Sequence, residues 1–272
     1  MGIVIVNGVS GASCSPRDRG LQFGDGLFET MLGVGGGVVE LGRHWRRLQD
    51  GCRRLGIHCP VTQEEVLTAL RAAELPRAVV KLIVTRGDSG RGYRCPPALV
   101  AHWVLFIDQA PEYPQAAREG GVAVTVCRTR VPIEDEAIAG IKHLNRLPQV
   151  MARREWNDEY HDGLLMDPDG RVVEGCANNL FVVTGGVLKT PDLSRSGVHG
   201  VMRERVLEHA KANGIPTRVC VLDRDDLSKA EEVFLTNAIY GITPVGSIES
   251  HRYSANTLTA RLVASLCRGT HC

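Results

Sequence analysis

The chain has 272 residues, of which 43% are hydrophobic and 23% charged, as in a soluble globular protein with one large domain or two modest ones. The net charge of +1 gives no reason to expect a nucleic acid, an anionic membrane surface or another polyanion as partner. No apolar run reaches transmembrane length, and residues 1–8 lack the basic segment of a signal peptide, so we expect a cytoplasmic protein.

The nine cysteines and nine histidines show none of the spacings that are typical of metal sites. The cysteines are odd in number and scattered along the chain, without a Cys-x-x-Cys pair. The sequence therefore predicts reduced thiols, no disulfide framework and no bound metal.

Hydrophobic patterning divides the first part of the chain into strands and two helices. Trp45, Leu48 and Cys52 recur at helical spacing with arginines on the other face, and the glycines before them indicate a hairpin. The expected strands are residues 3–9, 28–34, 38–41, 78–85 and 99–107, and the expected helices are residues 42–55 and 62–73. A polar, proline-broken stretch follows, so we place an N-terminal lobe at residues 1–110 and a linker at residues 111–117.

The second lobe, residues 118–272, is predicted to hold many short strands and few helices. The expected strands are residues 122–128, 163–166, 172–174, 179–183, 187–190 and 232–235, and the expected helices are residues 147–157, 201–213 and 257–266. Few of these helices can serve as crossovers between parallel strands. The order therefore indicates an α+β fold in two lobes and not a doubly wound parallel sheet.

Lys142 follows the apolar residues Ile138-Ala139-Gly140-Ile141, in a chain that has only five lysines among its 32 basic residues. Apolar surroundings lower the pKa of a lysine, and the neutral amine is a nucleophile that forms Schiff bases. The alternative is a lysine at the end of a strand whose ammonium group reaches solvent. The local sequence leaves both interpretations open.

Three further segments carry residue types that bind a phosphate or a cationic nitrogen. A glycine-rich loop runs into a helix at Val201 and Met202, where free N–H groups would receive an anion. Glu174 ends a β-branched run and Thr236 follows an apolar strand, positions at which such groups serve either as caps or as ligands. Arg47 lies on the polar face of a helix, where a solvated arginine is the alternative.

Taken in chain order, these segments resemble the fold-type IV pyridoxal-phosphate enzymes, the family of the branched-chain and D-amino-acid aminotransferases. The matching segments are Phe23-Gly24-Asp25-Gly26-Leu27-Phe28-Glu29, His44-x-x-Arg47-Leu48, Lys142-x-x-Asn145, Glu174-x-x-x-x-Asn179-Leu180-Phe181, Gly197-x-x-Gly200-Val201-Met202-Arg203 and Thr236-Asn237-Ala238. The agreement spans most of the chain, and an ordered set is far more specific than any one motif. Within the family, three segments are most similar to the aminodeoxychorismate lyases: residues 140–147, 89–93 and 47–50.

The resemblance implies a small N-terminal α/β lobe, a larger C-terminal pseudo-barrel lobe and pyridoxal 5'-phosphate as cofactor. It implies that Lys142, in the C-terminal lobe, holds the cofactor covalently and removes the substrate proton. Glu174 would face the pyridine nitrogen and keep it protonated. The phosphate ligands that it implies are Arg47, Val201, Met202 and Thr236.

The lyase resemblance implies the conversion of 4-amino-4-deoxychorismate to p-aminobenzoate and pyruvate, on the route to folate. This substrate bears two carboxylates, and arginine binds a carboxylate at two points. The candidate substrate ligands are Arg86, Arg91, Tyr93, Asn145 and Arg146, with a solvated surface loop as the alternative for the first three. The family also implies a homodimer.

Two alternatives remain open on the sequence. Branched-chain aminotransferases carry a tyrosine soon after the lysine, whereas Arg146 and Leu147 stand there in this chain, so the partner of the cofactor's phenolic oxygen is unassigned. A D-amino-acid or branched-chain aminotransferase would nevertheless use Lys142 in the same way. The alternative outside the enzymes is an inactive binding protein that keeps the fold.

Overall fold

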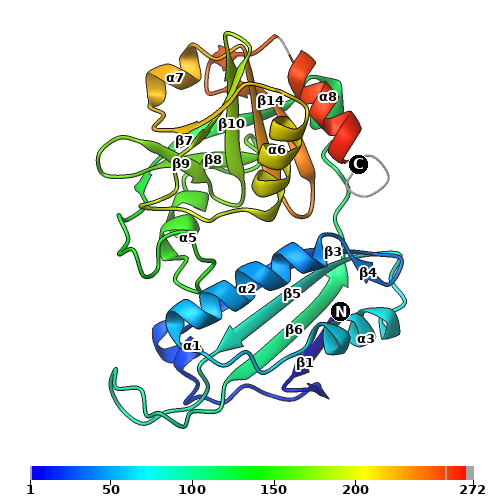
Figure 1. Cartoon of the computed structure of the whole chain (residues 1–272), viewed down its shortest axis with the longest axis vertical. Helices are drawn as coiled ribbons and strands as arrows, with labels where there is room; N and C mark the ends of the chain where they lie inside the picture. Colours follow the sequence, from blue (N-terminus) through cyan, green and yellow to red (C-terminus); the bar gives the residue numbers. More distant parts are fainter. Residues whose placement is uncertain (1, 255, 268–272) are drawn as a thin grey trace. The chain divides into compact units, whose positions relative to one another are not determined.

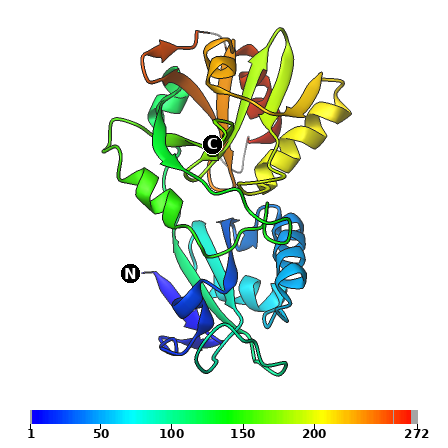
Figure 2. The ribbon, with the colours of Figure 1, turned by 90° about the vertical axis from the view of Figure 1, so that its left-hand side faces the viewer.

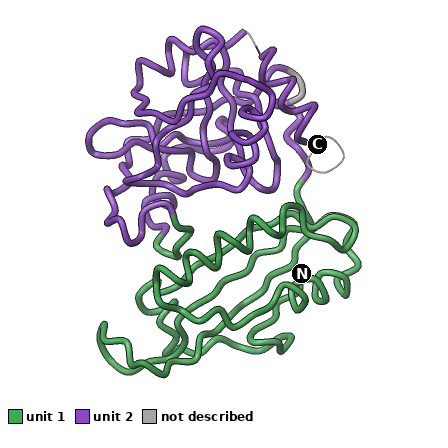
Figure 3. The backbone as a smooth tube through the Cα atoms, in the orientation of Figure 1, with its two compact units in different colours: residues 1–111, 141–145 green, residues 112–140, 146–272 purple. Residues whose placement is uncertain are grey.

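The computed structural model describes residues 2–254 and 256–267, and its backbone divides into two compact units (Figure 3). Unit 1 comprises Met1–Pro111 and Ile141–Asn145, and unit 2 comprises Glu112–Gly140 and Arg146–Cys272. The segment with Lys142 therefore lies in unit 1, whereas the sequence interpretation placed this lysine in the C-terminal lobe. The reason is a backbone pairing with a strand of unit 1, which a local sequence pattern does not reveal.

Unit 1 is built on a six-stranded sheet with the strand order β2-β1-β6-β5-β3-β4, in which all neighbours are antiparallel (Figure 1). Its strands are β1 (Ile3–Val6), β2 (Val9–Ser10), β3 (Gly26–Val34), β4 (Gly37–Val38), β5 (Arg77–Thr85) and β6 (His102–Gln109). The long central strands alternate buried and more exposed residues, as expected for a sheet that is covered on one face.

Two helices cover that face, α2 (Leu41–Leu55) and α3 (Gln63–Ala72), and Figure 2 shows both on the same side of the sheet. Thr62 and Glu65 form a capping box that begins α3, and a left-handed glycine, Gly56, ends α2. Gly51 of α2 packs on the side chain of Leu27, so this helix lies against β3. The short helix α1 (Arg19–Phe23) precedes β3.

Unit 2 is built on a nine-stranded mixed sheet with the order β12-β11-β10-β13-β14-β7-β8-β9, and β15 also pairs with β14. Its strands are β7 (Val122–Arg130), β8 (Asp162–Met166), β9 (Val172–Gly175), β10 (Asn179–Thr184), β11 (Val187–Pro191), β12 (Thr217–Cys220), β13 (Glu232–Asn237), β14 (Gly241–Ile248) and β15 (His251–Arg252). Its helices are α4 (Gln115–Glu119), α5 (Leu147–Arg153), α6 (Val201–Ala212), α7 (Arg224–Ser228) and α8 (Thr257–Leu266). The predicted α+β class is confirmed, since antiparallel pairs outnumber the parallel ones in both sheets.

The centre of the second sheet is buried on both faces. Phe181 and Val183 of β10 pack with α6 and α8, and Phe181 stacks on Phe234 of β13 with ring centroids 4.9 Å apart. Leu180 and Val182 alternate with them and enter a second apolar cluster on the other face. Because both faces of β10 are buried, its sequence is a continuous apolar run, and this run predicted the strand.

The longest strand that the sequence did not predict is β14. It contains Pro244, which lacks an N–H donor and is rarely found inside a strand, and Gly246, where the pairing register with β7 shifts. Helix α5 ends at Arg153, earlier than predicted. Within the described residues, no helix has both the length and the apolarity that crossing a membrane requires.

Candidate active site

Lys142 is held in unit 1 by backbone hydrogen bonds on both sides of it. The N–H of Phe28 donates to the carbonyl of Lys142 at 2.9 Å, and the N–H of Leu144 donates to the carbonyl of Gly26 at 3.0 Å. The segment thus runs beside the beginning of β3 as a short added strand, with an antiparallel bridge between Leu27 and His143. The position of Lys142 is therefore fixed by the sheet and not by a flexible loop.

The side chain of Lys142 is half-buried, and its amine lies against an aromatic ring. Nζ is 4.3 Å from the centroid of the Phe28 ring, a cation–π distance. His143, the next residue, is buried. Within unit 1, an aromatic ring and a buried histidine thus lie beside this half-buried lysine.

Arg47 lies on α2 and forms an ion pair with Glu29 of β3. The distances are 2.8 Å from Nε to Oε1 and 2.6 Å from Nη2 to Oε2, so the carboxylate binds one edge of the guanidinium at two points. His44, one helical turn earlier, places Nδ1 2.6 Å from Oε2 of the same carboxylate. Burial alone would raise the pKa of Glu29, but the charge and hydrogen bonds of Arg47 and His44 lower it to about 2. Glu29 is therefore ionised at neutral pH, and it fixes the orientation of Arg47.

Glu174 ends β9 and is buried in unit 2, where it accepts two hydrogen bonds. The N–H of Val198 donates to Oε2 at 2.9 Å, and the Nδ2 group of Asn179 donates to the same oxygen at 3.2 Å. The same Nδ2 group also donates to the carbonyl of Val198 at 2.9 Å. Asn179 thereby ties Glu174 to the loop that leads into α6.

The residues around Asn179 meet at the N-terminus of α6. Its strand partner on β13 is Thr236, and its Oδ1 lies where a Cβ on Gly200, the N-cap of α6, would stand. Only glycine therefore fits at position 200. The structure thus brings Glu174, Thr236 and the helix start at Val201 and Met202 into one group.

This group contains donors that no part of the described chain satisfies. The hydroxyl Oγ1 of Thr236 is buried and has no hydrogen-bond partner among the residues that the structure describes. The N-cap Gly200 offers no side chain to the first N–H groups of α6. Such N–H groups, together with the positive end of the helix dipole, bind anions. These donors make the group a candidate anion site, with the carboxylate of Glu174 beside it.

A buried network, which the sequence interpretation missed, holds the loops of this group in place. Asp162 of β8 accepts from the N–H groups of Gly163 and Cys176 at 2.8 and 3.0 Å, and from Nδ2 of Asn178 at 2.6 Å. Asn178 in turn accepts from Nδ2 of Asn237 at 2.7 Å, next to Thr236. Burial raises the pKa of Asp162, although its hydrogen bonds act in the opposite direction. An acid at the start of an apolar strand was the signal available in the sequence.

Arg86, a predicted substrate ligand, is engaged within unit 1. Its guanidinium forms a two-point ion pair with Asp25, at 2.7 and 2.9 Å, and donates to the carbonyls of Leu55 and Gly56 at the end of α2. Arg19 binds Asp25 as well, at 2.8 Å. Burial would raise the pKa of Asp25, but these two arginines lower it. The contacts give Arg86 a structural role at the helix end.

The other predicted substrate ligands lie at more exposed positions. Arg91 is exposed, and the ring of Tyr93, which is 83% exposed, lies 5.3 Å from that of Phe23. Asn145 donates from Nδ2 to the carbonyl of Gly24 at 3.2 Å, and Arg146 is half-buried immediately before α5. The assignment of these four residues as substrate ligands remains a prediction.

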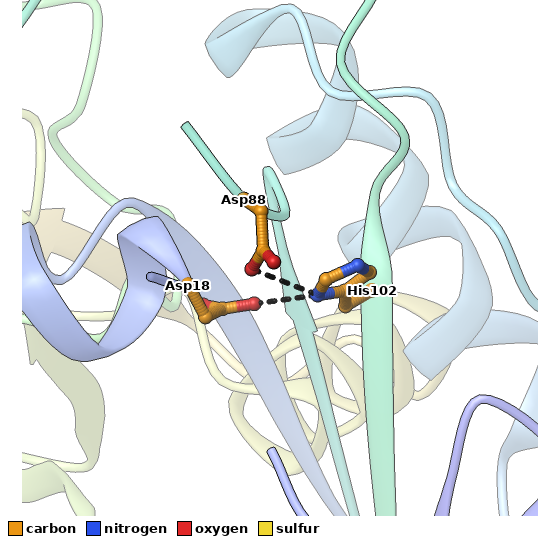
Figure 4. A group of neighbouring side chains, drawn as sticks. All are labelled: Asp18, Asp88 and His102. Atoms are coloured by element: carbon orange, nitrogen blue, oxygen red, sulfur yellow. Dashed lines mark hydrogen bonds and ion pairs between the residues drawn. The ribbon is translucent and has the colours of Figure 1, made fainter. Parts of the chain in front are cut away.

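A second polar cluster, drawn in Figure 4, joins Asp18, Asp88 and His102, and its ligand atoms lie close enough together to hold a metal ion. Asp18 already has protein partners, however. It accepts from the hydroxyl of Thr85 at 2.7 Å and from the N–H of Gly20 at 2.7 Å, and His102 Nδ1 lies 2.9 Å away. We therefore assign Asp18 a structural role, as the N-cap of α1 and an anchor for the loop with Asp88.

Comparison with known proteins gives one family. The family model described as amino-transferase class IV matches residues 26–248. The chain is 37% identical, over 88% of its length and 83% of the relative's, to a Methanocaldococcus jannaschii protein provisionally named a branched-chain-amino-acid aminotransferase. It is 33% identical to the aminodeoxychorismate lyase of Vibrio harveyi, over 96% of this chain and 98% of the relative.

The solved structures that match this chain include the same two kinds of enzyme. The crystal structure of 4-amino-4-deoxychorismate lyase from Pseudomonas aeruginosa matches 97% of this chain and 97% of its own, with a TM-score of 0.91 and 42% identity. The branched-chain aminotransferase of Escherichia coli matches 96% of this chain and 91% of its own, with a TM-score of 0.84 and 26% identity. The fold predicted from the sequence is thus confirmed.

Proposed function

The chain belongs to the class IV aminotransferase family, and on this premise we propose that it is a pyridoxal-5'-phosphate-dependent lyase that converts 4-amino-4-deoxychorismate to p-aminobenzoate and pyruvate. The observation that carries the proposal is the 42% identity to a lyase of this activity over 97% of both chains. The residues from Gly140 to Leu147, around the lysine, support the same activity.

The donor groups of unit 2 fit the cofactor's phosphate. Thr236 has a buried hydroxyl without a partner among the described residues, and the N-terminus of α6 lacks a side-chain cap. A phosphate dianion provides the acceptors that both require. We assign phosphate binding to Arg47, Thr236 and the backbone of Val201 and Met202.

Glu174 and Lys142 have the remaining two roles. Glu174 is a buried carboxylate that accepts from the N–H of Val198 and from Asn179, and a protonated pyridine nitrogen would be a favourable partner for it. Lys142 supplies the amine that binds the cofactor covalently. When bound, the cofactor supplies an electron sink for the bonds made and broken at the substrate amine carbon.

The proton transfers at the substrate belong to Lys142. The amine of Lys142 would act as the base that takes the proton from C4 of the substrate. Cleavage of the C3–O bond to the enolpyruvyl group, with a proton delivered to the departing methylene, would then give pyruvate and leave the carbocycle aromatic. A positioned acid–base group of this kind contributes about 10²–10⁴-fold in rate. The rigid backbone pairing of Lys142 with β3 supports the role, because a base must be held in a fixed position.

The test is to incubate the purified protein with 4-amino-4-deoxychorismate and to measure both products. Release of pyruvate in step with p-aminobenzoate is the expected result. The 37% identity to a branched-chain-aminotransferase-like relative favours the second candidate, a transaminase. Conversion of the cofactor to pyridoxamine phosphate by a D- or branched-chain amino acid, without pyruvate from aminodeoxychorismate, would support that candidate instead.

A variant at Lys142 separates an enzyme from an inactive binding protein. Borohydride reduction of the wild-type protein is expected to abolish the cofactor's absorption band and to label Lys142, as mass spectrometry of the peptides would show. Lys142→Ala should lose both the label and the activity. If the label appears in the Lys142→Ala protein, the assignment of this lysine is wrong.

We further propose a homodimer in the cytoplasm. Helix α5 exposes an apolar stripe, with Leu147 69%, Val150 55% and Met151 44% exposed at the spacing of one helix face. A second copy of the chain is the partner that the family implies for it. The described cysteines are all free thiols, which suits a reducing compartment.

A further inference from the structure

Arg203 occupies an unfavourable electrostatic position in unit 2. It is in the first turn of α6, and only 8% of its surface is exposed. Burial lowers the pKa of Arg203, although an arginine remains protonated in proteins. The N-terminus of a helix also carries a partial positive charge, which repels a cation in the first turn. Two effects therefore disfavour this side chain where it stands.

Among the residues that the structure describes, no ion pair offsets these two effects. Nε of Arg203 donates to the hydroxyl of Thr190 at 3.2 Å, and Nη2 donates to the carbonyl of Pro191 at 2.9 Å, so both partners are neutral. Asp192 and Glu174 are the acids whose charges reach Arg203 and favour its protonated form. Neither is within ion-pair distance in the described structure.

Arg203 begins next to the anion site of unit 2. Its Cβ is 3.6 Å from the place where a Cβ on the N-cap Gly200 would stand, and helical side chains lean toward the N-terminus. The buried hydroxyl of Thr236, which has no partner among the described residues, lies in the same group through Asn179. A dianion bound there would interact favourably both with the positive helix end and with the buried positive charge of Arg203.

We propose that Arg203 determines the affinity of this site for a phosphate dianion, by the field of its buried charge. The inference rests on the proposed function, because it takes the N-terminus of α6 as the phosphate site. Glu174 does not cancel the effect, since in that function it faces the cationic pyridine nitrogen. A charge separated from a dianion by several ångströms of protein changes affinity by roughly ten- to a hundredfold.

The experiment compares two ligands on the cofactor-free protein, pyridoxal 5'-phosphate and pyridoxal, which lacks the phosphate. Their dissociation constants are measured by absorbance titration for wild type, Arg203→Gln and Arg203→Lys. Gln keeps N–H donors for Thr190 and Pro191 but removes the charge, whereas Lys keeps the charge. Arg205→Gln is the matched control, because it removes the same charge from a half-exposed position on the same helix.

Arg203→Gln is expected to weaken pyridoxal 5'-phosphate binding about ten- to a hundredfold and pyridoxal binding less than about threefold. Arg203→Lys and Arg205→Gln should stay near wild type. Equal losses for both ligands, or no loss for either, would overturn the proposal. If Arg203→Gln does not fold, Arg203→Lys decides, since a selective loss of phosphate affinity with the charge retained contradicts a field effect. Failure of the wild type to bind pyridoxal 5'-phosphate would instead overturn the proposed function.

Discussion

Arg47 and Glu29 are joined at two points, with Nε 2.8 Å from Oε1 and Nη2 2.6 Å from Oε2. The carboxylate is 1% exposed and also binds His44, so the guanidinium is held in one plane by a partner that is itself fixed. An arginine that is oriented before its ligand arrives loses little side-chain entropy on binding. Glu29 is therefore the residue that orients Arg47 for the phosphate binding proposed for it.

Glu29→Gln should destabilise the protein in a pH-dependent way. The pKa of Glu29 falls from its usual 4.5 to about 2, which corresponds to about 3 kcal/mol of stability from its ionised form. Because the folded pKa is the lower one, this contribution is complete above about pH 4.5 and is lost as the pH falls toward 2. Urea unfolding of both proteins at several pH values measures it.

The difference between wild type and Glu29→Gln should be largest at neutral pH and shrink below pH 4.5. Glu64→Gln, at an exposed position on α3, serves as the control and should show little difference at any pH. A difference that is constant from pH 7 to pH 3 would mean that the ionised carboxylate does not stabilise the fold.

Asp162→Asn should unfold at lower urea concentration and bind the cofactor less tightly. In wild type, the carboxylate of Asp162 accepts from Asn178 and from backbone N–H groups. The NH2 group of an asparagine would face these donors instead, and each buried donor left without an acceptor costs about 1–3 kcal/mol. The loops that carry Glu174 and Thr236 would loosen as a result. Asp158→Asn, at a fully exposed position, is the matched control. Wild-type stability of Asp162→Asn would show that the network is dispensable.

Gly200→Ala should abolish tight cofactor binding while leaving most of the fold intact. The added methyl group would collide with Oδ1 of Asn179 and displace the residue that links Glu174, Val198 and Thr236. Titration with pyridoxal 5'-phosphate and thermal unfolding report the two effects separately. Gly42→Ala, where a Cβ meets no atom within 4 Å, should bind the cofactor normally. Normal binding by Gly200→Ala would remove Asn179 from the site.

Val150→Glu should weaken the proposed dimer. A charge in the middle of the apolar stripe on α5 would have to be buried or repelled, so the dimer dissociation constant should rise at least about tenfold. Sedimentation velocity at several concentrations measures it. Val219→Glu is matched in residue type and exposure, 51% against 55%, and lies on β12. Equal behaviour of the two variants would place the interface elsewhere.

Most elements were predictable because their residues repeat with a regular period. The spacing of Trp45, Leu48 and Cys52 predicted α2, and helix α8 has the predicted bounds. Strand β14 was not predictable, because Pro244 and Gly246 are turn signals by themselves. Gly246 is tolerated in β14 because the pairing register with β7 shifts there, and that shift is a tertiary property.

The site shows the same division between local and long-range information. Asn179 is the strand partner of Thr236 and donates to Glu174, so the register of β10 and β13 places these three residues together. Their role in cofactor binding stays a prediction. Asp25 lies in the family motif Phe23–Glu29, but its ion pair with Arg86 joins residues 61 positions apart, which the motif does not reveal. The sequence therefore offered Arg86 as a free ligand, when it is bound to a carboxylate and two carbonyls.

The backbone pairing of the lysine segment with β3 also determines when unit 1 can complete its folding during synthesis. Unit 1 includes Ile141–Asn145, so a ribosome that has synthesised only the first 111 residues has not yet produced one of its strands. The edge of β3 at Gly26 and Phe28 then lacks its hydrogen-bond partners until residue 145 has emerged. Lys142 thus joins unit 1 late, and the lysine proposed to hold the cofactor belongs to the segment that pairs with the edge of β3.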